Sequence, residues 1–510
     1  MKRWAKALLL LAAMLCLALP ALAEADVGRG ATGDAVVEIQ TRLNQLGYGA
    51  GSADGQYGGR TEDAVKQFQK INGLEETGVV DEATRACLFS ENALDAAGRS
   101  APADPDVVLV QRQLRLLGVA LEITGKCDEA TVEALKTYQA AHGLQASGEV
   151  SPATLRELGA EIDARAAERL LVSNGDAATP LYGYANAAGE IVIPPQFAWA
   201  SGVWRNGLVR VTFADGRSGY IDLNGETALV LARLEGEDFS EGVAMVSRDG
   251  RVGYIDMNGD FVWPLSENKL SGAMCTAFAG GRARVNDKLI DRFGNTYPTP
   301  LDLKDVTSMI STGFCEPFSE GLMCLRKSTP EGRKYGYIDE TGATAIPFQF
   351  DYAESFSEGL AVVGVGLEPS DMKYGYIDAE GAEAIPCEYS LALPFCEGAA
   401  VVRDAKGVWG TLDPAGKFTA AKTQWDAAID AGYSEGLLAV EADGWVGFVD
   451  AAGELVIPSE YLKPEEARDA ALTSDRLYAF RNGVCLVYAA DGTPLYIDAA
   501  GKTLFAANGF

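Results

Sequence analysis

Apolar residues recur at helical spacing in the first part of the chain and form two stripes that predict amphipathic helices. The first stripe consists of Val36, Ile39, Leu43 and Leu46, and the second of Ala64, Val65, Phe68 and Ile71. Gly47 follows the first stripe, where a glycine commonly ends a helix. Thr61 precedes the second stripe and is expected to be its N-cap, and a third short helix is expected to start at Asp81. Three short helices around one small core are the natural arrangement for residues 33–89.

The same pattern returns further along the chain, which indicates that one helical module has been duplicated. The offset is 71 residues in the first helix and 70 residues beyond it. The matched positions include Gln40 and Gln111, Leu43 and Leu114, Thr61 and Thr131, Phe68 and Tyr138, and Gln69 and Gln139. In the third helix of the second copy, Ser151 supplies an N-cap and Pro152 stands at the first helical position.

Beyond residue 176 the helical periodicity gives way to short β-branched and aromatic runs separated by glycines, as in "YGYIDAEGAEAIP" at 374–386. The aspartate of this stretch recurs at Asp222, Asp256, Asp291, Asp339, Asp378, Asp413, Asp450 and Asp498, with Asn186 as a ninth member. An aromatic residue three positions before a glycine recurs in the same frame, at Trp204, Phe239, Phe278, Phe318, Phe356, Phe395, Tyr433 and Phe480. The spacing predicts a repeat array in which each unit runs turn, strand, loop, strand, tight turn, strand.

The recurring aspartate is best interpreted as the corner of a hairpin. An aspartate at the first turn position can accept a hydrogen bond from a backbone N–H two residues on, and the following glycine supplies the left-handed backbone of a three-residue loop. The proline of the "IP" that follows is expected to end ladder pairing. Calcium binding by these turns is disfavoured, because each offers one or two carboxylates where calcium gathers about six to eight oxygen ligands.

The aromatic residues of the repeats are expected in the core between units, because a lone hairpin cannot bury its apolar face. A carbohydrate-binding surface is the alternative for one set of them, and core packing is the simpler interpretation. This set consists of Tyr220, Tyr254, Tyr337, Tyr376 and Trp409.

The amino terminus predicts a secretory signal peptide over residues 1–23. Three basic residues precede an apolar run that ends at Ala21 and Ala23, and cleavage is expected before Glu24. No later run is apolar over the length of a membrane helix, so we expect no integral membrane segment after cleavage. The mature chain then has 40 basic and 72 acidic residues, a net charge of −32. This charge argues against nucleic acid as a partner.

Histidine and cysteine restrict the chemistry available. His142 is the single histidine, so two-histidine metal sites are excluded and a Ser-His or Cys-His relay could be built only around this residue. We interpret His142 as a solvated residue facing a loop. The eight cysteines beyond the signal peptide form no C-x-x-C pair, so neither a zinc site nor a compact disulfide framework is indicated. We therefore predict no catalytic residues, no metal site and no cofactor.

The first helical module carries three motif runs. They are Gln40, Leu43, Leu46, Gly47 and Tyr48; then Asp54, Gly55, Tyr57 and Gly58; then Thr61, Ala64, Val65, Phe68, Gln69, Gly73 and Leu74. In these runs the module resembles the peptidoglycan-binding-like domain of exported wall proteins. The resemblance implies non-covalent attachment to peptidoglycan, with the expected contacts around the glycine-rich loop at Tyr48, Asp54, Tyr57 and Arg60. The second copy is degenerate in this loop.

In the repeats an aromatic or apolar residue and a glycine precede "YID", "TLD" or "FVD". Examples are Tyr335-Gly336, Tyr374-Gly375, Trp409-Gly410 and Val446-Gly447. By these steps residues 176–510 resemble WG repeats, which implies a β-rich scaffold and no settled activity. About nine units fit a closed propeller awkwardly, since four to eight blades are typical, so an open superhelical array stays an alternative.

The sequence therefore predicts a multidomain chain: two small three-helix peptidoglycan-binding-like modules at 26–90 and 104–160, then an all-β antiparallel hairpin repeat array at 176–510. Linkers are expected at 91–103 and 161–175, the second with some helical character. The array is expected to be propeller-like or open superhelical.

The leading functional interpretation is an exported, non-catalytic protein, secreted and associated with the cell wall, or periplasmic in a cell with two membranes. Its helical modules would bind peptidoglycan or another cell-wall glycan, and the array would bind an extracellular protein or glycan. Two alternatives stay open: a wall-acting enzyme or hydrolase accessory subunit that uses carboxylates, and a structural spacer.

Overall fold

The computed structural model describes residues 26–89, 93, 104–176, 178–266, 269, 275–297, 299–301, 303, 306–307, 316–330, 332–366, 371–429, 432–466, 472 and 477–510. The predicted signal peptide lies outside these residues, and so does the linker 91–103 apart from residue 93. The chain divides into two compact units, 1–102 and 103–510. No helix in the described ranges is long and apolar enough to cross a membrane.

The first unit is the predicted three-helix module, with α2 (Asp34–Gln45), α3 (Gly59–Ile71) and α4 (Glu82–Leu88). The two apolar stripes of the sequence meet in one buried core. The prediction that Thr61 caps the second helix is wrong, because α3 begins two residues earlier with Gly58 as its N-cap residue. Thr61 is 1 % exposed, and its hydroxyl accepts a hydrogen bond from Gln40 Nε2 at 3.1 Å. The Thr61 hydroxyl therefore satisfies the buried Gln40 amide and does not cap the helix.

The second unit begins with the duplicated module, α5 (Pro105–Leu116), α6 (Glu129–Ala141) and α7 (Pro152–Ala166). Ser151 caps α7 as predicted, since its hydroxyl accepts a hydrogen bond from Thr154 N at 3.2 Å. The helix continues into the segment 161–175, because Ile162 and Ala166 extend its apolar face into the core of the β array.

Nine small antiparallel sheets follow in the described residues, and each is one blade of a propeller. Blades 1 to 3 are β1 (Leu170–Ser173), β2 (Tyr182–Ala185), β3 (Ile191–Phe197); β4 (Trp199–Ala200), β5 (Leu208–Thr212), β6 (Ser218–Asp222), β7 (Thr227–Leu231); and β8 (Glu235–Gly236), β9 (Val243–Arg248), β10 (Arg251–Asp256), β11 (Phe261–Trp263). Blades 4 to 6 are β12 (Arg282–Val285), β13 (Lys288–Asp291), β14 (Thr296–Tyr297); β15 (Val306–Thr307), β16 (Leu322–Thr329), β17 (Gly332–Asp339), β18 (Thr344–Phe350); and β19 (Tyr352–Ala353), β20 (Ala361–Val365), β21 (Lys373–Ile377), β22 (Glu383–Tyr389). Blades 7 to 9 are β23 (Leu391–Ala392), β24 (Ala400–Arg403), β25 (Trp409–Leu412), β26 (Phe418–Ala420); β27 (Ala427–Ala428), β28 (Leu437–Ala442), β29 (Trp445–Asp450), β30 (Leu455–Tyr461); and β31 (Val484–Tyr488), β32 (Pro494–Asp498), β33 (Thr503–Ala506).

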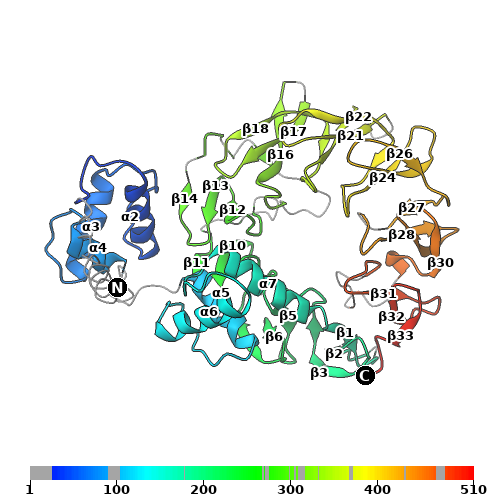
Figure 1. The fold of residues 1–510 in the computed structure, drawn as a ribbon, viewed down its shortest axis with the longest axis horizontal. Coiled ribbons are helices and arrows are strands. Elements are labelled where there is room, and N and C mark those ends of the chain that lie inside the picture. Colours follow the sequence, from blue (N-terminus) through cyan, green and yellow to red (C-terminus); the bar gives the residue numbers. More distant parts are fainter. Residues whose placement is uncertain are drawn as a thin grey trace, which may run out of the picture. The chain divides into compact units, whose positions relative to one another are not determined.

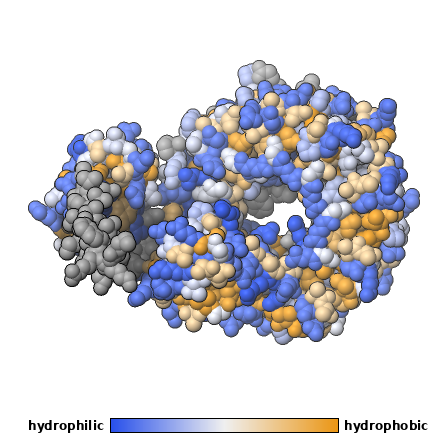
Figure 2. Space-filling model, in the orientation of Figure 1, coloured by the Kyte–Doolittle hydropathy of each residue, from blue (hydrophilic) through white to orange (hydrophobic). Residues whose placement is uncertain are grey.

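The blades follow one another round a closed ring, which Figure 1 shows, and the space-filling view in Figure 2 shows an opening at its centre. Blade 9 meets blade 1 through backbone hydrogen bonds from Ser173 N to Ala507 O (2.8 Å) and from Phe510 N to Ser173 O (3.2 Å). The two blades also share one hydrophobic core. The array is thus a propeller, and β1 of its first blade lies within the segment 161–175 that the sequence assigned to a linker.

The aromatic-Gly step is explained by a close backbone approach. A Cβ at Gly375 would lie 2.5 Å from the carbonyl oxygen of Ile385 on the neighbouring strand, so only glycine fits. The register shifts at this point, between Tyr374 and Tyr376. The prediction that the proline of "IP" ends ladder pairing is wrong, because β22 continues through Pro386 to Tyr389. Proline is tolerated there because it sits at a bulge of the outermost strand.

Six of the repeated tyrosines each join one blade to the next. Their hydroxyls donate to backbone carbonyls across the blade boundary at 2.6 to 3.1 Å. The pairs are Tyr184 and Ser201, Tyr220 and Glu237, Tyr254 and Thr276, Tyr337 and Glu354, Tyr376 and Leu393, and Tyr496 and Leu171. These rings are at most 1 % exposed, and Trp409 is 3 % exposed, so the core interpretation is confirmed and the carbohydrate surface is not formed by them.

The repeated aspartates are hairpin corners, as predicted. Asp378 Oδ1 accepts hydrogen bonds from Glu380 N (3.2 Å) and Ala382 N (2.8 Å). Asn186 makes the equivalent pair in blade 1, which shows that the corner needs an oxygen acceptor and no charge.

A second set of polar side chains was not predicted to act between blades. In the turn after the anchor aromatic, a glutamate or asparagine accepts a hydrogen bond from the glycine N–H of the next turn round the ring, at 2.6 to 3.2 Å. We call these residues the turn acceptors. The pairs are Asn206 and Gly242, Glu241 and Gly281, Glu320 and Gly359, Glu358 and Gly398, Glu397 and Gly436, and Glu435 and Gly483.

The second helical module packs against blades 2 to 4, which the sequence did not predict. Val108 and Leu109 of α5 lie in one core cluster with Leu208 and Phe239 of the ring. An Asp106 carboxylate is paired with both terminal nitrogens of the Arg292 guanidinium. Because apolar burial and a two-pronged ion pair act together, this module is part of the propeller unit.

Candidate functional site

The buried side chain of Gln40 fixes the glycine-rich loop of the first module, between α2 and α3, by hydrogen bonds. Its Oε1 accepts a hydrogen bond from Gly55 N at 3.0 Å. Its Nε2 donates to Asp54 Oδ1, to Gln56 O and to Thr61 Oγ1, each at 3.1 Å. Gln40 is 1 % exposed, so this motif glutamine shapes the loop and does not face a ligand.

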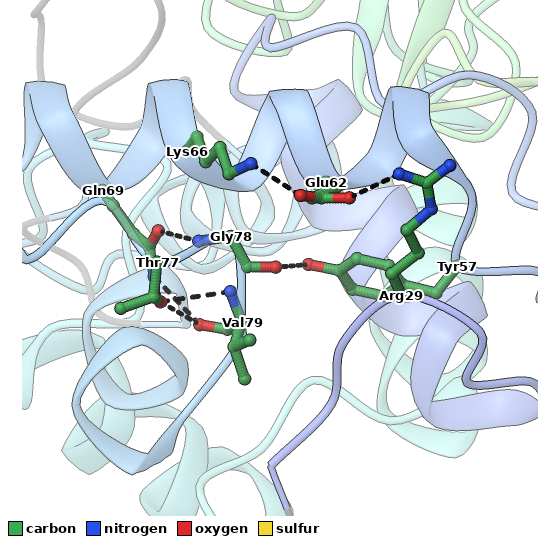
Figure 3. Close-up of polar contacts among 8 residues, drawn as sticks. All are labelled: Arg29, Tyr57, Glu62, Lys66, Gln69, Thr77, Gly78 and Val79. Atoms are coloured by element: carbon green, nitrogen blue, oxygen red, sulfur yellow. Dashed lines mark hydrogen bonds and ion pairs between the residues drawn. The ribbon is translucent and has the colours of Figure 1, made fainter.

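Gln69 does the same for the turn at 77–79, as Figure 3 shows. Its Oε1 accepts from Gly78 N at 2.8 Å, and its Nε2 donates to Thr77 Oγ1 (3.0 Å) and Val79 O (2.9 Å). The Tyr57 hydroxyl donates to Gly78 O at 2.9 Å and so joins the glycine-rich loop to this turn.

A row of charges runs along α3 over this turn. Gly78 has a φ of +72°, and a Cβ there would lie 2.7 Å from Lys66 Cε and 2.9 Å from Glu62 Cγ, so the two side chains cover the turn closely. Lys66 Nζ lies 2.6 Å from one Glu62 oxygen, and Arg29 Nη1 lies 3.3 Å from the other (Figure 3). These ion pairs lie at the surface, where ion pairs contribute little to stability.

Two of the four predicted contact residues are buried. Tyr48 is 5 % exposed and Tyr57 is 2 % exposed. The Tyr48 ring packs edge-on against Phe68 at 5.4 Å between centroids, and its hydroxyl accepts from Asn72 Nδ2 at 3.2 Å. Burial raises the pKa of Tyr57. Both rings therefore support the loop from inside the module.

The other two predicted contacts, Asp54 and Arg60, are exposed. Hydrogen bonds from Gln56 N and Gln40 Nε2 lower the pKa of Asp54, so it presents a carboxylate. Gln56 is exposed beside it, and Arg29, whose side chain is 72 % exposed, adjoins Gly59 at the start of α3. We call Arg29, Asp54, Gln56 and Arg60 the loop face.

The loop face combines two guanidinium groups, one carboxylate and one amide. Such a set can hydrogen-bond the carboxylates, amides and hydroxyls of a glycan or peptide. Arg29 and Gln56 were missed by the sequence reasoning. Arg29 lies before the motif runs, and Gln56 occupies the variable position of the loop motif, so neither carries a pattern that could have identified it.

The second module differs around the same positions. Val119, Ala130 and Ala141 stand where the first module has Tyr48, Arg60 and Ile71. These smaller residues line a groove of about 520 Å³, together with Leu117, Ala120, Leu121, Glu133, Ala134, Thr137, Tyr138, His142, Glu161 and Arg165.

His142 is one of the residues that line this groove. Its ring stacks on Tyr138 with 3.9 Å between centroids, and its Nε2 lies 3.4 Å from a Glu161 oxygen. Its side chain is 31 % exposed. Among the residues that the structure describes, no three His, Cys, Asp or Glu side chains are placed to hold a metal ion.

The comparisons with known proteins agree with the two halves of this architecture. Residues 32–88 and 103–158 match the family model described as putative peptidoglycan binding domain. Residues 182–215, 335–366 and 374–406 match the model described as WG containing repeat. The chain therefore carries two modules of the putative peptidoglycan binding domain followed by WG repeats.

Curated relatives match in one short region. The spore cortex-lytic enzyme of Bacillus subtilis (strain 168) is 46 % identical over 67 residues, which are 13 % of this chain and 22 % of that protein. The enzyme of the same name from Bacillus cereus is 35 % identical over 69 residues, which are 14 % of this chain and 27 % of that protein. The chain thus spans about a quarter of the length of these relatives or less.

Among solved structures, a crystal structure of the eukaryotic initiation factor matches 66 % of this chain and 96 % of its own at 10 % identity, with a TM-score of 0.42.

Proposed function

We propose that the chain is an exported, non-catalytic wall protein that binds peptidoglycan through its first helical module. The observation that supports this most directly is the match of residues 32–88 to the peptidoglycan binding domain, in a unit with its own buried core and an exposed loop face. The signal peptide predicted at residues 1–23 would direct export of the chain to the wall. The protein is then secreted and wall-associated, or periplasmic in a cell with two membranes.

The non-catalytic part of the proposal is supported by the structural use of the repeated carboxylates. The corner aspartates accept backbone N–H groups within their own hairpins, and the glutamates among the turn acceptors accept backbone N–H groups of the next blade. A catalytic pair needs carboxylates that face a substrate. Similarity to the cortex-lytic enzymes covers only the binding module.

The propeller is proposed to present its rim to an extracellular protein or glycan. Large apolar side chains are exposed at the start of several outermost strands, which favours a binding role over that of a spacer. They are Ile191, Phe261, Leu455, Val456 and Leu504. Figure 2 shows apolar areas on the rim around blades 8 and 1.

Co-sedimentation of residues 24–510 with purified sacculi tests the wall proposal. We expect saturable binding that Arg60→Gln weakens about fivefold or more, because a charged hydrogen-bond donor of the loop face is lost. Lys70→Gln is the matched control, since Lys70 is an exposed cation on the same helix away from the loop. Equal binding by both variants would remove the loop face from the proposal.

Muropeptide release from the same sacculi tests the absence of catalysis. We expect no release above the background of heat-inactivated protein. Release that disappears on one Asp or Glu substitution would establish an enzyme instead.

A further inference from the structure

Blade 1 lacks the leading elements of blades 2 and 3. In blades 2 and 3, a short inner strand and a turn with a turn acceptor precede the long strands. In blade 1 only residues 167–169 separate α7 from β1, so there is no room for either. The end of α7 enters the ring at this place, which we call the seam.

The seam interrupts the chain of contacts between turn acceptors and glycines. Asn482 of blade 9 is in the position of a turn acceptor, but no turn of blade 1 follows it. Among the described residues, no side-chain oxygen accepts a hydrogen bond from Gly207, the equivalent glycine in blade 2. A side-chain oxygen acceptor of the kind that joins neighbouring turns elsewhere in the ring is therefore missing here.

A pocket of about 240 Å³ lies at the seam, and it is rich in arginine. Its lining includes Arg169, Arg205 and Arg481, with Asn482 and a single carboxylate, Asp163. Three guanidinium groups against one carboxylate is an unusual local excess in a chain of net charge −29.

Arg169 and Arg205 keep capacity for a ligand. Arg169 Nε donates to Leu223 O at 3.1 Å, and Arg205 Nη1 donates to Trp204 O at 3.1 Å. Each of these bonds uses one of the five N–H groups that a guanidinium carries. The Glu168 carboxylate is 3.9 Å from Arg169 Nη1, at the outer limit of an ion pair. These contacts orient the two side chains without filling the pocket.

We propose that the seam pocket binds the terminal carboxylate of a short peptide. This carboxylate would be a hydrogen-bond acceptor of the kind that a glutamate provides between other neighbouring turns. Arginine forks suit a carboxylate because they bind both of its oxygens. The carboxylate chemistry rests on the pocket itself. Its assignment to a peptide end, as found on peptidoglycan stems, rests on the proposed wall association.

Calorimetric titration of residues 24–510 with N-acetyl-D-alanyl-D-alanine tests the proposal, with the C-terminal amide of the same dipeptide and inorganic phosphate as further probes. We expect saturable binding of the acid in the micromolar to millimolar range, and binding of the amide at least tenfold weaker. Phosphate is expected to compete weakly. No saturation by the acid, or equal binding of the amide, would overturn the proposal. Binding of phosphate alone would overturn the assignment to a peptide.

Variants locate the site. Arg205→Gln and Arg481→Gln are each expected to weaken binding of the acid at least tenfold, with the circular dichroism spectrum unchanged. Arg156→Gln is the control, because Arg156 is an exposed arginine of α7 that does not line the pocket. An unchanged affinity in both pocket variants would place the ligand elsewhere and overturn the proposal. If the first module fails to bind sacculi while the dipeptide still binds, the proposed function fails and the pocket stands.

Discussion

Removing one tyrosine hydroxyl from the ring tests the account of how blades hold together. Tyr376 is fully buried, and its hydroxyl donates to Leu393 O in the next blade at 2.8 Å. Tyr376→Phe removes this bond and keeps the edge-on packing of the ring against Phe395, whose centroid is 4.9 Å away. Blade 8 already carries Phe448 at the equivalent position, so we expect the fold to be retained.

The magnitude follows from what the deletion leaves behind. A typical net hydrogen bond contributes about 0.5–1.5 kcal/mol, and a buried carbonyl left without its donor costs about 1–3 kcal/mol. We expect a loss of about 1–2 kcal/mol, because the Leu393 carbonyl loses its donor beside a fully buried ring. Amides near Leu393 would then exchange roughly five- to thirtyfold faster, since these energies shift an opening equilibrium by that factor.

Native-state hydrogen exchange measured by mass spectrometry is the appropriate assay, because a chain with two units has no single free energy of unfolding. Tyr374→Phe is the matched control: its ring is partly buried in the same strand, two residues earlier, and makes an edge contact with Tyr352. We expect little change in exchange near Leu393 for this control. If the two variants change hydrogen exchange near Leu393 equally, or if Tyr376→Phe does not accelerate it, the tyrosine hydroxyl does not stabilise the contact between these blades.

Two further variants probe the docking of the second module and the protonation of the buried corner residue Asp256. Asp106→Asn should destabilise the docking of α5 by about 2 kcal/mol, because it leaves the half-buried Arg292 without its carboxylate. The double variant with Arg292→Gln should be destabilised by less than the sum of the two single variants. Faster hydrogen exchange confined to residues 104–166 would show the loss of docking. Burial raises the pKa of Asp256 to about 6, so the folded state binds the carboxyl proton of Asp256 more tightly than the unfolded chain does. The stability of the folded state therefore falls as the pH rises from about 4 to 6. Asp256→Asn should lessen the loss of thermal stability between pH 5 and 7 by about 1 kcal/mol, and an unchanged pH profile would contradict this assignment.

Local patterns in the sequence predicted the elements well because each is fixed by short-range chemistry. The apolar stripes of the helical modules, the Ser151 cap and the aspartate corners depend on residues a few positions apart. The burial of the repeated tyrosines followed from the need of a hairpin to cover its apolar face. Their donation to the next blade could not be read from sequence, since the acceptor is a backbone carbonyl set by blade geometry.

The failures have a common physical origin in contacts between distant segments. Closure of the ring depends on Ser173 meeting Ala507, and docking of the second module depends on Asp106 meeting Arg292, more than 180 residues apart. At the candidate site, the four predicted contacts include the buried Tyr48 and Tyr57 as well as the exposed Asp54 and Arg60. Only burial separates them.

The most direct test of the account is the distribution of sacculus binding between the two units. Residues 24–102 and 103–510 would be produced separately, at the boundary between the compact units, and each would be titrated against purified sacculi beside the 24–510 chain. We expect 24–102 to bind saturably, with an affinity close to that of the longer chain, and Arg60→Gln to weaken the binding of both. Sacculus binding carried wholly by 103–510, with none by 24–102, would contradict it.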